Sequence, residues 1–287
     1  MEKEVATVQQ PYLADDAFLA DVEQARAELD RLQIWWLGQS GFLVQWQGHH
    51  LLFDPYLSDS LTRKYAATDK PHERMTGRVI APEGLGFVDV VTSSHNHTDH
   101  LDAETLVPLR VANPALHLVI PAANRAFVAE RLGCEPGWPL GLDAGETVSA
   151  GPFTITAVPA AHETLDRDGQ GRHRYLGYVA RCGPWTIYHS GDTVLYDGMV
   201  ETLRAFAVDF ALLPINGRAA ERRVAGNLDG REAAELAHAI GAGVVIPCHY
   251  DMFAFNTATP DLLIATCAAV GQPYHVLRNG ERWSATG

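Results

Sequence analysis

The sequence VTSSHNHTDHLD, residues 91–102, places three histidines and one aspartate within six consecutive positions. In an extended segment, side chains two residues apart point to the same side, so His95 and His97 can both reach one metal ion. Asp99 and His100 then turn toward a neighbouring position. A chance match to the pattern H-x-H-x-D-H in this chain is on the order of one in a thousand. The spacing therefore predicts a site for two adjacent divalent cations.

The residues on either side of this cluster predict where it lies in the fold. FVDVVTSSH, residues 87–95, is rich in β-branched and apolar residues, which predicts a buried strand that ends at the first histidine. DAETLVPLR, residues 102–110, predicts a helix with Asp102 at its N-cap. The cluster is therefore expected on a loop that leads from a strand into a helix.

The first part of the chain predicts one helix and then a meander of strands. Residues 12–32 carry apolar side chains at helical spacing, so we expect an N-terminal helical extension over residues 1–32. The apolar stripe consists of Leu13, Phe18, Leu19, Val22, Ala25 and Leu29. Short strands are predicted at residues 34–38, 41–47 and 50–55, with Gln47 and Gly48 as a hairpin turn. We place the core domain at residues 33–287, without an internal boundary.

The rest of the chain alternates predicted strands with predicted helices. The strands cover residues 153–162, 175–182, 185–192, 208–217 and 243–251, and the helices lie near residues 122–132, 195–206, 230–240 and 259–270. Two β-rich halves with interleaved helices favour an α/β (α+β) fold. In this fold two mixed sheets pack face to face and the helices cover their outer faces.

Composition narrows the kinds of partner. The formal net charge of −13 argues against a nucleic-acid or anionic-membrane surface, because both need a basic patch, and favours a small-molecule substrate. The four cysteines show no C-x-x-C spacing, and the first residues lack the basic start and apolar run of a secretion signal. Both features predict a cytoplasmic protein. The longest apolar runs are far shorter than the roughly 20 residues that span a bilayer.

The histidine cluster at residues 95–100 resembles the metal-binding signature of the metallo-β-lactamase-fold hydrolases. The resemblance implies a four-layer αββα sandwich. It also implies a third histidine, a bridging aspartate and a last histidine, each after a later strand. AVPAAHE offers His162, YHSGDT offers Asp192, and VIPCHYD offers His249. Taken alone, either histidine would more often be a hydrogen-bonded core residue, but each stands in the order and context that the family requires.

The same resemblance assigns the ligands to two ions. It implies that the first ion is held by His95, His97 and His162, that the second is held by Asp99, His100 and His249, and that Asp192 bridges them. Imidazoles and carboxylates together suit Zn²⁺ first, Mn²⁺ next and Fe²⁺ third. The expected cofactor is therefore a pair of divalent metal ions.

Such a pair predicts a hydrolase. Two divalent ions about 3.5 to 4 Å apart can share a water and lower its pKa to about 7, which makes a bridging hydroxide available as the nucleophile. Asp99 is expected to bind the second ion and to orient this hydroxide. His189 and Tyr250 are candidates for contacting the oxyanion or protonating the leaving group. Supporting the metal ligands is the alternative role for each of them.

Basic residues in two loops predict an anionic substrate. The loop at residues 62–78 carries Arg63, Lys64, Lys70, Arg74 and Arg78, and the loop after LLPING carries Arg218, Arg222 and Arg223. We expect Arg218 and Arg222, together with Asn216, to bind a phosphate or carboxylate. For each of these residues, a solvated loop without contact to the substrate is the alternative.

Further motifs resemble one branch of this superfamily. WWLGQSG (residues 35–41), IYHSGDT (187–193) and VVIPCHYDMF (244–253) are similar to the L-ascorbate-6-phosphate lactonase branch, and the likeness spans roughly residues 33–283. It implies the opening of a lactone, possibly that of a sugar phosphate, and a homo-oligomer. A phosphodiesterase with the same dinuclear site is the alternative, and a metal-binding sensor without catalysis is a third hypothesis.

Overall fold

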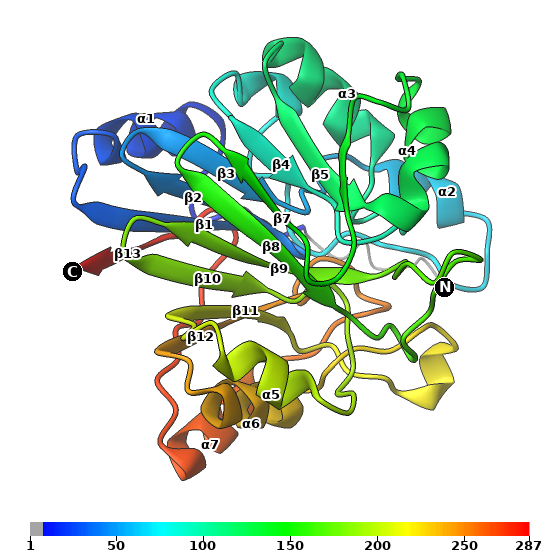
Figure 1. Cartoon of the computed structure of the whole chain (residues 1–287), viewed down its shortest axis with the longest axis vertical. Helices are drawn as coiled ribbons and strands as arrows, with labels where there is room; N and C mark the ends of the chain where they lie inside the picture. Colours follow the sequence, from blue (N-terminus) through cyan, green and yellow to red (C-terminus); the bar gives the residue numbers. More distant parts are fainter. Residues whose placement is uncertain (1–7, 287) are drawn as a thin grey trace, which may run out of the picture.

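Two mixed β-sheets packed face to face form the centre of the molecule (Figure 1). The computed structural model describes residues 8–286. In spatial order the first sheet contains β13 (Arg282–Thr286), β1 (Arg31–Gly38), β2 (Gly41–Trp46), β3 (His49–Phe53), β4 (Val90–Thr92), β5 (His117–Pro121) and β6 (Leu140–Leu142). The second contains β12 (Val244–Cys248), β11 (Phe210–Pro214), β10 (Trp185–His189), β9 (Leu176–Cys182), β8 (Phe153–Pro159) and β7 (Thr147–Ala150).

Helices cover both outer faces of this sandwich (Figure 1). On the first sheet lie α1 (Asp15–Ala25), α3 (Ala103–Ala112) and α4 (Arg125–Leu132), and on the second lie α5 (Met199–Arg204), α6 (Gly230–Ile240) and α7 (Asp261–Val270). A further short helix, α2 (Ser60–Tyr65), belongs to the long loop after β3. The predicted four-layer α/β arrangement is therefore confirmed.

Adjacent residues on β1 show how the layers are held together. Trp36 belongs to the apolar cluster between the two sheets, whereas Trp35 belongs to the cluster beneath the helices of the first sheet. Successive side chains on a strand point to opposite faces, so a strand buried on both faces is apolar at nearly every position. This explains why β1, the first strand of the core domain, carries two consecutive tryptophans.

The N-terminal helix is shorter than predicted and belongs to the main core. It spans Asp15–Ala25, and Leu29, expected on its apolar stripe, is 55% exposed. Phe18 packs edge-on against Trp35, with 6.4 Å between the ring centroids. The proposed boundary between residues 32 and 33 falls inside β1. Of the predicted extension over residues 1–32, residues 1–7 lie outside the described part of the chain.

The strands differ from the prediction mainly in length and number. The hairpin between β2 and β3 is confirmed: Gln47 and Gly48 both have positive φ, at 51° and 79°, as a tight two-residue turn requires. The strand predicted at residues 87–95 is reduced to Val90–Thr92, because the backbone leaves the sheet before the first histidine. The sequence reading missed β5, β6, β7, β13 and α2.

Candidate metal centre

The candidate metal ligands all follow the ends of strands. His95 lies after β4, His162 after β8, Asp192 after β10 and His249 after β12. A loop that leaves a sheet is free of the ladder hydrogen bonds, so its side chains can turn toward a common point while the strand holds their backbone in place. The two sheets thus bring residues that are far apart in the sequence to the same end of the sandwich.

The structure brings all seven predicted ligands together in two groups. In the first, one ligand atom from each of His95, His97, His162 and Asp192 lies within 4.8 Å of every other. In the second, the same holds for Asp99, His100 and His249. The grouping matches the assignment that the family resemblance implied.

Asp192 lies between the two groups. Its Oδ1 is 3.3 Å from His100 Nε2, and its Oδ2 is 3.8 Å from His162 Nε2 and 3.5 Å from His249 Nε2. One carboxylate therefore contacts a histidine of the first group and two of the second. This is the position expected of a bridging ligand.

The donor atoms fit a pair of transition-metal ions. The Nε2 atoms of His95 and His100 and the Oδ1 of Asp192 are buried and have no hydrogen-bond partner among residues 8–286. Buried polar atoms of this kind are rare unless something outside the chain satisfies them. Four ligands at about 2.1 Å from one ion would lie about 3.4 Å apart, close to the distances measured around Asp192. The residues present therefore suit a dinuclear site with imidazole and carboxylate ligands.

The opposite ring atoms of the histidines are held by the protein. His100 Nδ1 donates to Asp54 Oδ2 at 2.8 Å, and His162 Nδ1 donates to the Gly226 carbonyl at 2.9 Å. His95 Nδ1 lies 2.9 Å from Ser94 Oγ. These contacts select the tautomer whose Nε2 carries the lone pair and fix the orientation of each ring.

Asp54 is a functional residue that the sequence reading missed. It ends the strand sequence LLFD, so it has the same position relative to β3 as the metal ligands have to their strands. The carboxylate is fully buried and accepts hydrogen bonds from Thr92 Oγ1, the Ser94 backbone and His100. Burial alone would raise its pKa, but the hydrogen bond from His100, followed by the charges of His189 and His100 and the contact with Ser94, lowers it. Its position after a strand was the available signal.

The pKa values of His95 and His97 are shifted in the opposite direction to that of His249. Burial lowers the pKa of His95 well below its usual value, and burial also lowers that of His97. Burial opposes protonation of His249 as well, but the charges of Asp192 and Asp99 outweigh it and raise its pKa to about 9. In the metal-free protein the second group therefore holds protons that a metal ion must displace, which makes metal uptake depend on pH.

A cavity of about 340 Å³ opens onto the two groups. Its lining residues are Leu61, Lys64, Tyr65, Lys70, His72, Asn96, His97, Thr98, Asp99, Arg131, His162, Asp192, Val224, Ala225, His249 and Asn256. Three of the lining residues are cations, and two of these, Lys64 and Lys70, belong to the basic loop at residues 62–78 that the sequence indicates.

The third cation, Arg131 on α4, was not predicted. Its Nη1 donates to the carbonyls of Asn96 and Leu101 and so holds both ends of the histidine loop.

His189 and Tyr250 do not reach this cavity. His189 Nε2 donates to the Ser40 carbonyl at 2.8 Å, and its Nδ1 accepts from the Gly191 backbone. The hydroxyl of Tyr250 donates to the Leu277 carbonyl, and its ring stacks on Trp36. Because these polar atoms are buried and already bonded to the backbone, the placement of His189 and Tyr250 does not support a role in oxyanion contact or proton transfer and favours the alternative role of support behind the ligands. Both residues pack behind the site instead.

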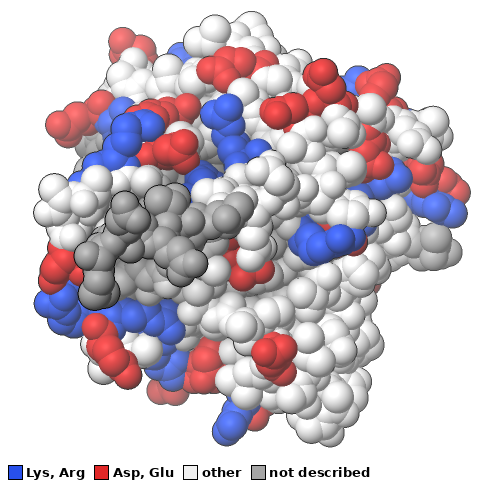
Figure 2. Space-filling model, turned by 180° about the vertical axis from the view of Figure 1, so that it is seen from behind, with Lys and Arg blue, Asp and Glu red and all other residues white. Residues whose placement is uncertain are grey.

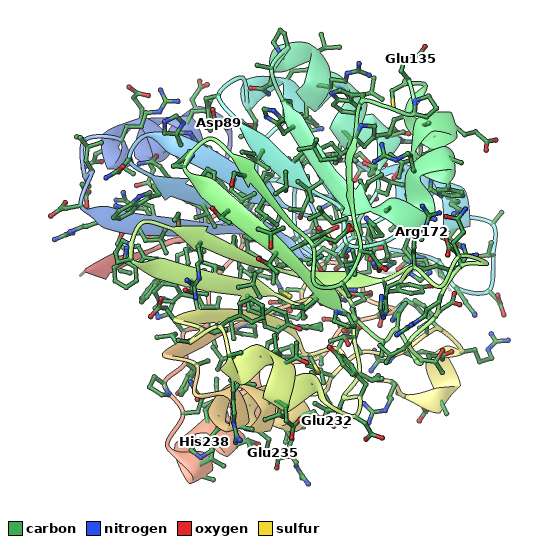
Figure 3. All side chains as sticks on the ribbon, in the orientation of Figure 1. Asp89, Glu135, Arg172, Glu232, Glu235 and His238 are labelled. Carbon is green, nitrogen blue, oxygen red and sulfur yellow. The ribbon has the colours of Figure 1, made fainter. Side chains whose placement is uncertain are left out.

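The predicted substrate-binding residues are also placed differently. Arg218 forms an ion pair with Glu232 on α6, which Figure 3 labels at the end of the molecule formed by α5, α6 and α7. Arg222 and Asn216 both donate to Asn256 Oδ1, at 2.7 and 3.0 Å. Asn256 lines the cavity, whereas the other three do not. Direct contact of Arg218, Arg222 or Asn216 with a substrate is therefore not supported by their placement.

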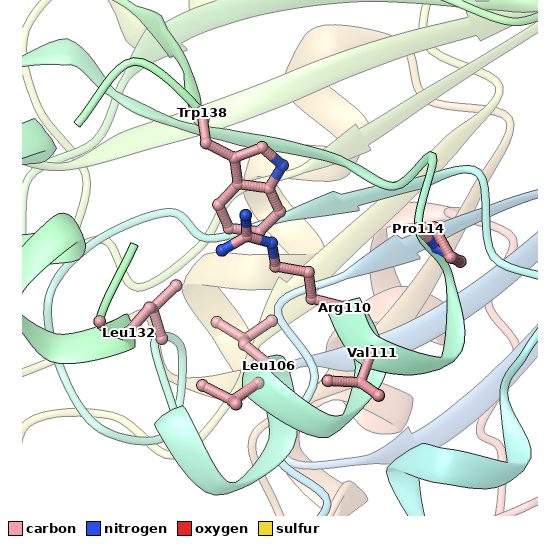
Figure 4. Close-up of a pocket in the computed structure, with 8 residues that line it drawn as sticks. Leu106, Arg110, Val111, Pro114, Leu132 and Trp138 are labelled. Carbon is pink, nitrogen blue, oxygen red and sulfur yellow. The ribbon is translucent and has the colours of Figure 1, made fainter. Parts of the chain in front are cut away.

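A second cavity lies away from the candidate ligands. It has about 350 Å³ and lies between α3 and the end of α4, with the Arg110 guanidinium 4.0 Å above the Trp138 ring (Figure 4). Its other lining residues are apolar or glycine. It contains none of the candidate metal ligands.

A family model described as a beta-lactamase superfamily domain matches residues 49–250. This match covers more than half of the chain and includes both groups of candidate ligands. The chain belongs to the beta-lactamase superfamily. A UPF0173 metal-dependent hydrolase of Opitutus terrae is 28% identical to this chain over 255 residues, which cover 87% of this chain and 98% of the relative.

Solved structures share the fold of this superfamily member. Igni18, described as a novel metallo hydrolase from Ignicoccus hospitalis, covers 90% of this chain and 99% of its own, with a TM-score of 0.64 and 21% identity. The metallo-beta-lactamase fold protein YhfI from Bacillus subtilis covers 89% of this chain and 100% of its own, with a TM-score of 0.63 and 19% identity. The fold is therefore the metallo-β-lactamase fold.

Two further features concern the helices of the molecule and the charges on its surface. Among the described residues, none of the helices has the length and apolar character needed to cross a bilayer. On the face opposite to that of Figure 1, acidic and basic side chains are interspersed (Figure 2). Three cations, Lys64, Lys70 and Arg131, line the metal-site cavity and form no ion pair within residues 8–286.

Proposed function

We propose that this protein is a metal-dependent hydrolase that opens a lactone carrying an anionic group. The observation that carries the proposal is the pair of ligand groups sharing Asp192 at the base of one cavity. The relatives named as metal-dependent hydrolases support it. When bound, two divalent ions would polarise the substrate carbonyl and lower the pKa of a shared water. Zn²⁺ is the first choice of metal, before Mn²⁺ and Fe²⁺.

The chain's own residues would position this chemistry. Asp192 holds the two ligand groups at a fixed separation. Asp99 Oδ2 lies 3.5 Å from His249 Nε2 and 3.7 Å from His100 Nε2, and the carboxylate also faces the cavity. We infer that Asp99 orients the attacking water while it binds the second ion. Leu61 and Tyr65 form a partly apolar wall that limits the access of bulk water.

The cations in the cavity support an anionic substrate. Lys64, Lys70 and Arg131 line the cavity and have no carboxylate within ion-pair distance in the described part of the chain. Neighbouring arginines in the same loops are neutralised, since Arg63 pairs with Glu104 and Arg223 with Asp69. Cations left unpaired beside a metal site suit a phosphate or carboxylate group on the substrate.

Replacing Lys70 with alanine is expected to raise KM for an anionic lactone about 10- to 100-fold, because a charge-assisted contact is worth about 1.5 to 3 kcal/mol. KM for a neutral lactone should not change. Arg218→Ala is the matched control, because its guanidinium is already bound by Glu232. Steady-state kinetics of both variants on both substrates measure the effect. Equal changes in KM for the two variants, or a change with the neutral lactone, would contradict the role of Lys70.

A panel of lactones and bis-p-nitrophenyl phosphate, run with zinc and with manganese, tests the reaction itself. We expect turnover of at least one lactone, with anionic lactones preferred. The likeness of residues 35–41 and 187–193 to the lactonase branch supports this choice of ester. Turnover of the phosphodiester alone would indicate a phosphodiesterase. Tight metal binding without turnover of either class would indicate a metal-binding sensor.

Two further predictions stay open to experiment. We infer a reducing cytoplasm as the location, and the four cysteines, all free thiols in the structure, agree with it. A homo-oligomer is the other prediction, and it rests on the family resemblance alone. Sedimentation of the purified protein would measure the oligomeric state.

A further inference from the structure

Gln39 occupies the turn between β1 and β2, directly beside the second ligand group. The residue is 1% exposed and has a positive φ of 50°. Its carbonyl accepts hydrogen bonds from Trp36 Nε1 at 3.0 Å and from the backbone N–H of His249 at 2.8 Å. The main chain of Gln39 therefore ties this turn to the strand end that carries a candidate ligand. A substitution of the side chain leaves these backbone bonds in place.

The side chain of Gln39 points into the second group. Its Nε2 lies 2.8 Å from Asp99 Oδ2 and 3.0 Å from His249 Nε2. Its Oε1 is buried and has no hydrogen-bond partner among the described residues. A histidine nitrogen has one lone pair, so His249 Nε2 cannot accept from Gln39 and bind a metal ion at the same time. The contact with Gln39 must change when the second ion binds.

Rotation of the terminal amide by a half turn exchanges its oxygen and nitrogen, which have almost the same shape. The oxygen would then take the place now held by Nε2, next to two candidate ligand atoms of the second group, Asp99 Oδ2 and His249 Nε2. Amide and carboxylate oxygens are common ligands of Mn²⁺ and of other hard cations.

We propose that Gln39 is a further metal-binding residue, whose amide oxygen binds the ion held by Asp99, His100 and His249. The proposal rests on the dinuclear site of the proposed function. It makes the two positions chemically unequal. The first has three imidazoles and Asp192, whereas the second has two imidazoles and oxygens from Asp99, Asp192 and Gln39. The second position should therefore favour Mn²⁺ or Fe²⁺ over Zn²⁺ more than the first does.

Calorimetric titration of the metal-free protein with Mn²⁺ tests this role without measuring activity. The wild type should bind two ions per chain. Gln39→Leu should bind the second ion on the order of 10- to 100-fold more weakly and the first ion unchanged. Gln39→Asn should behave similarly, because its shorter side chain does not reach the ion and asparagine tolerates the positive φ. Gln45→Leu is the matched control, since Gln45 is equally buried but contacts His50.

Gln39→Glu separates a ligand from a hydrogen-bond donor. A glutamate oxygen can bind the ion, so the second Mn²⁺ should bind at least as tightly as in the wild type. A carboxylate cannot donate to Asp99, so equal weakening in the Glu and Leu variants would overturn the ligand role. Unchanged binding of two ions in the Leu and Asn variants would also overturn it while leaving the dinuclear site intact. Failure of the wild type to bind any divalent ion would overturn the proposed function as well.

Discussion

Replacing Asp192 with asparagine is expected to lower kcat/KM by about 10³-fold, because a bridging carboxylate stabilises both ions and their Lewis-acid action is worth several kcal/mol. Its two oxygens contact His100, His162 and His249, so one substitution disturbs both ligand groups. Asparagine keeps the volume but offers one neutral oxygen and one amide donor. Kinetics on a substrate turned over by the wild type, together with metal content by mass spectrometry, measure the effect.

Asp197→Asn is the control for this experiment. Asp197 lies in the same loop but is exposed and does not line the cavity. It should keep wild-type activity and two metal ions per chain. Retention of both ions and of full activity in Asp192→Asn would show that the two groups do not share a ligand. The dinuclear account of the site would then be wrong.

Replacing Asp54 with alanine is expected to destabilise the metal-free protein by about 3 to 5 kcal/mol. The carboxylate is fully buried and accepts hydrogen bonds from Thr92, Ser94 and His100. Its removal leaves the Thr92 and Ser94 donors without this partner and takes away the carboxylate bonded to Nδ1 of the buried His100, whose pKa is raised by Asp192 and Asp99 against the opposing effect of burial. Urea unfolding of the metal-free protein measures the change.

The same substitution should weaken metal binding. Without Asp54, the ring of His100 is no longer fixed in the tautomer that presents Nε2, and loss of such a partner typically costs about 10- to 100-fold in metal affinity. Asp54→Asn, which keeps one acceptor, should show a smaller loss on both measurements. A stable Asp54→Ala protein that binds metal normally would mean that Ser94 alone orients His100, since Ser94 Oγ lies 3.3 Å from His100 Nδ1.

The ligands could be predicted because the histidine cluster has a diagnostic spacing and because the family resemblance implies three more ligands, each placed after a strand. The histidine cluster is contiguous, and His162, Asp192 and His249 each follow a recognisable apolar strand. The residue that follows the end of a strand lies at the rim of the sandwich, and this position does not depend on how the rest of the chain is folded. Asp54 follows the same rule after β3, although it contacts the candidate ligand His100 and is not itself one of the seven.

The residues around the ligands could not be predicted in this way. His189 stands next to a ligand motif, yet its ring donates to the carbonyl of Ser40, which comes from a distant part of the chain. Arg218 and Lys70 are both basic loop residues, but only Lys70 lines the cavity, because Glu232 on α6 binds Arg218. Which of two similar side chains faces the cavity depends on partners brought in by other elements.

The amino-acid sequence, together with the family resemblance of its histidine cluster, determined the layered α/β fold and the positions of the candidate ligands, because strand patterns and strand ends are local properties of the chain. Only the tertiary structure decided which side chains face the cavity and which are satisfied by the backbone. Gln39 and Arg131 became visible as site residues only there. The physical reason is that a polar side chain's role depends on the hydrogen-bond partners that folding places beside it, and these partners lie far away in the sequence.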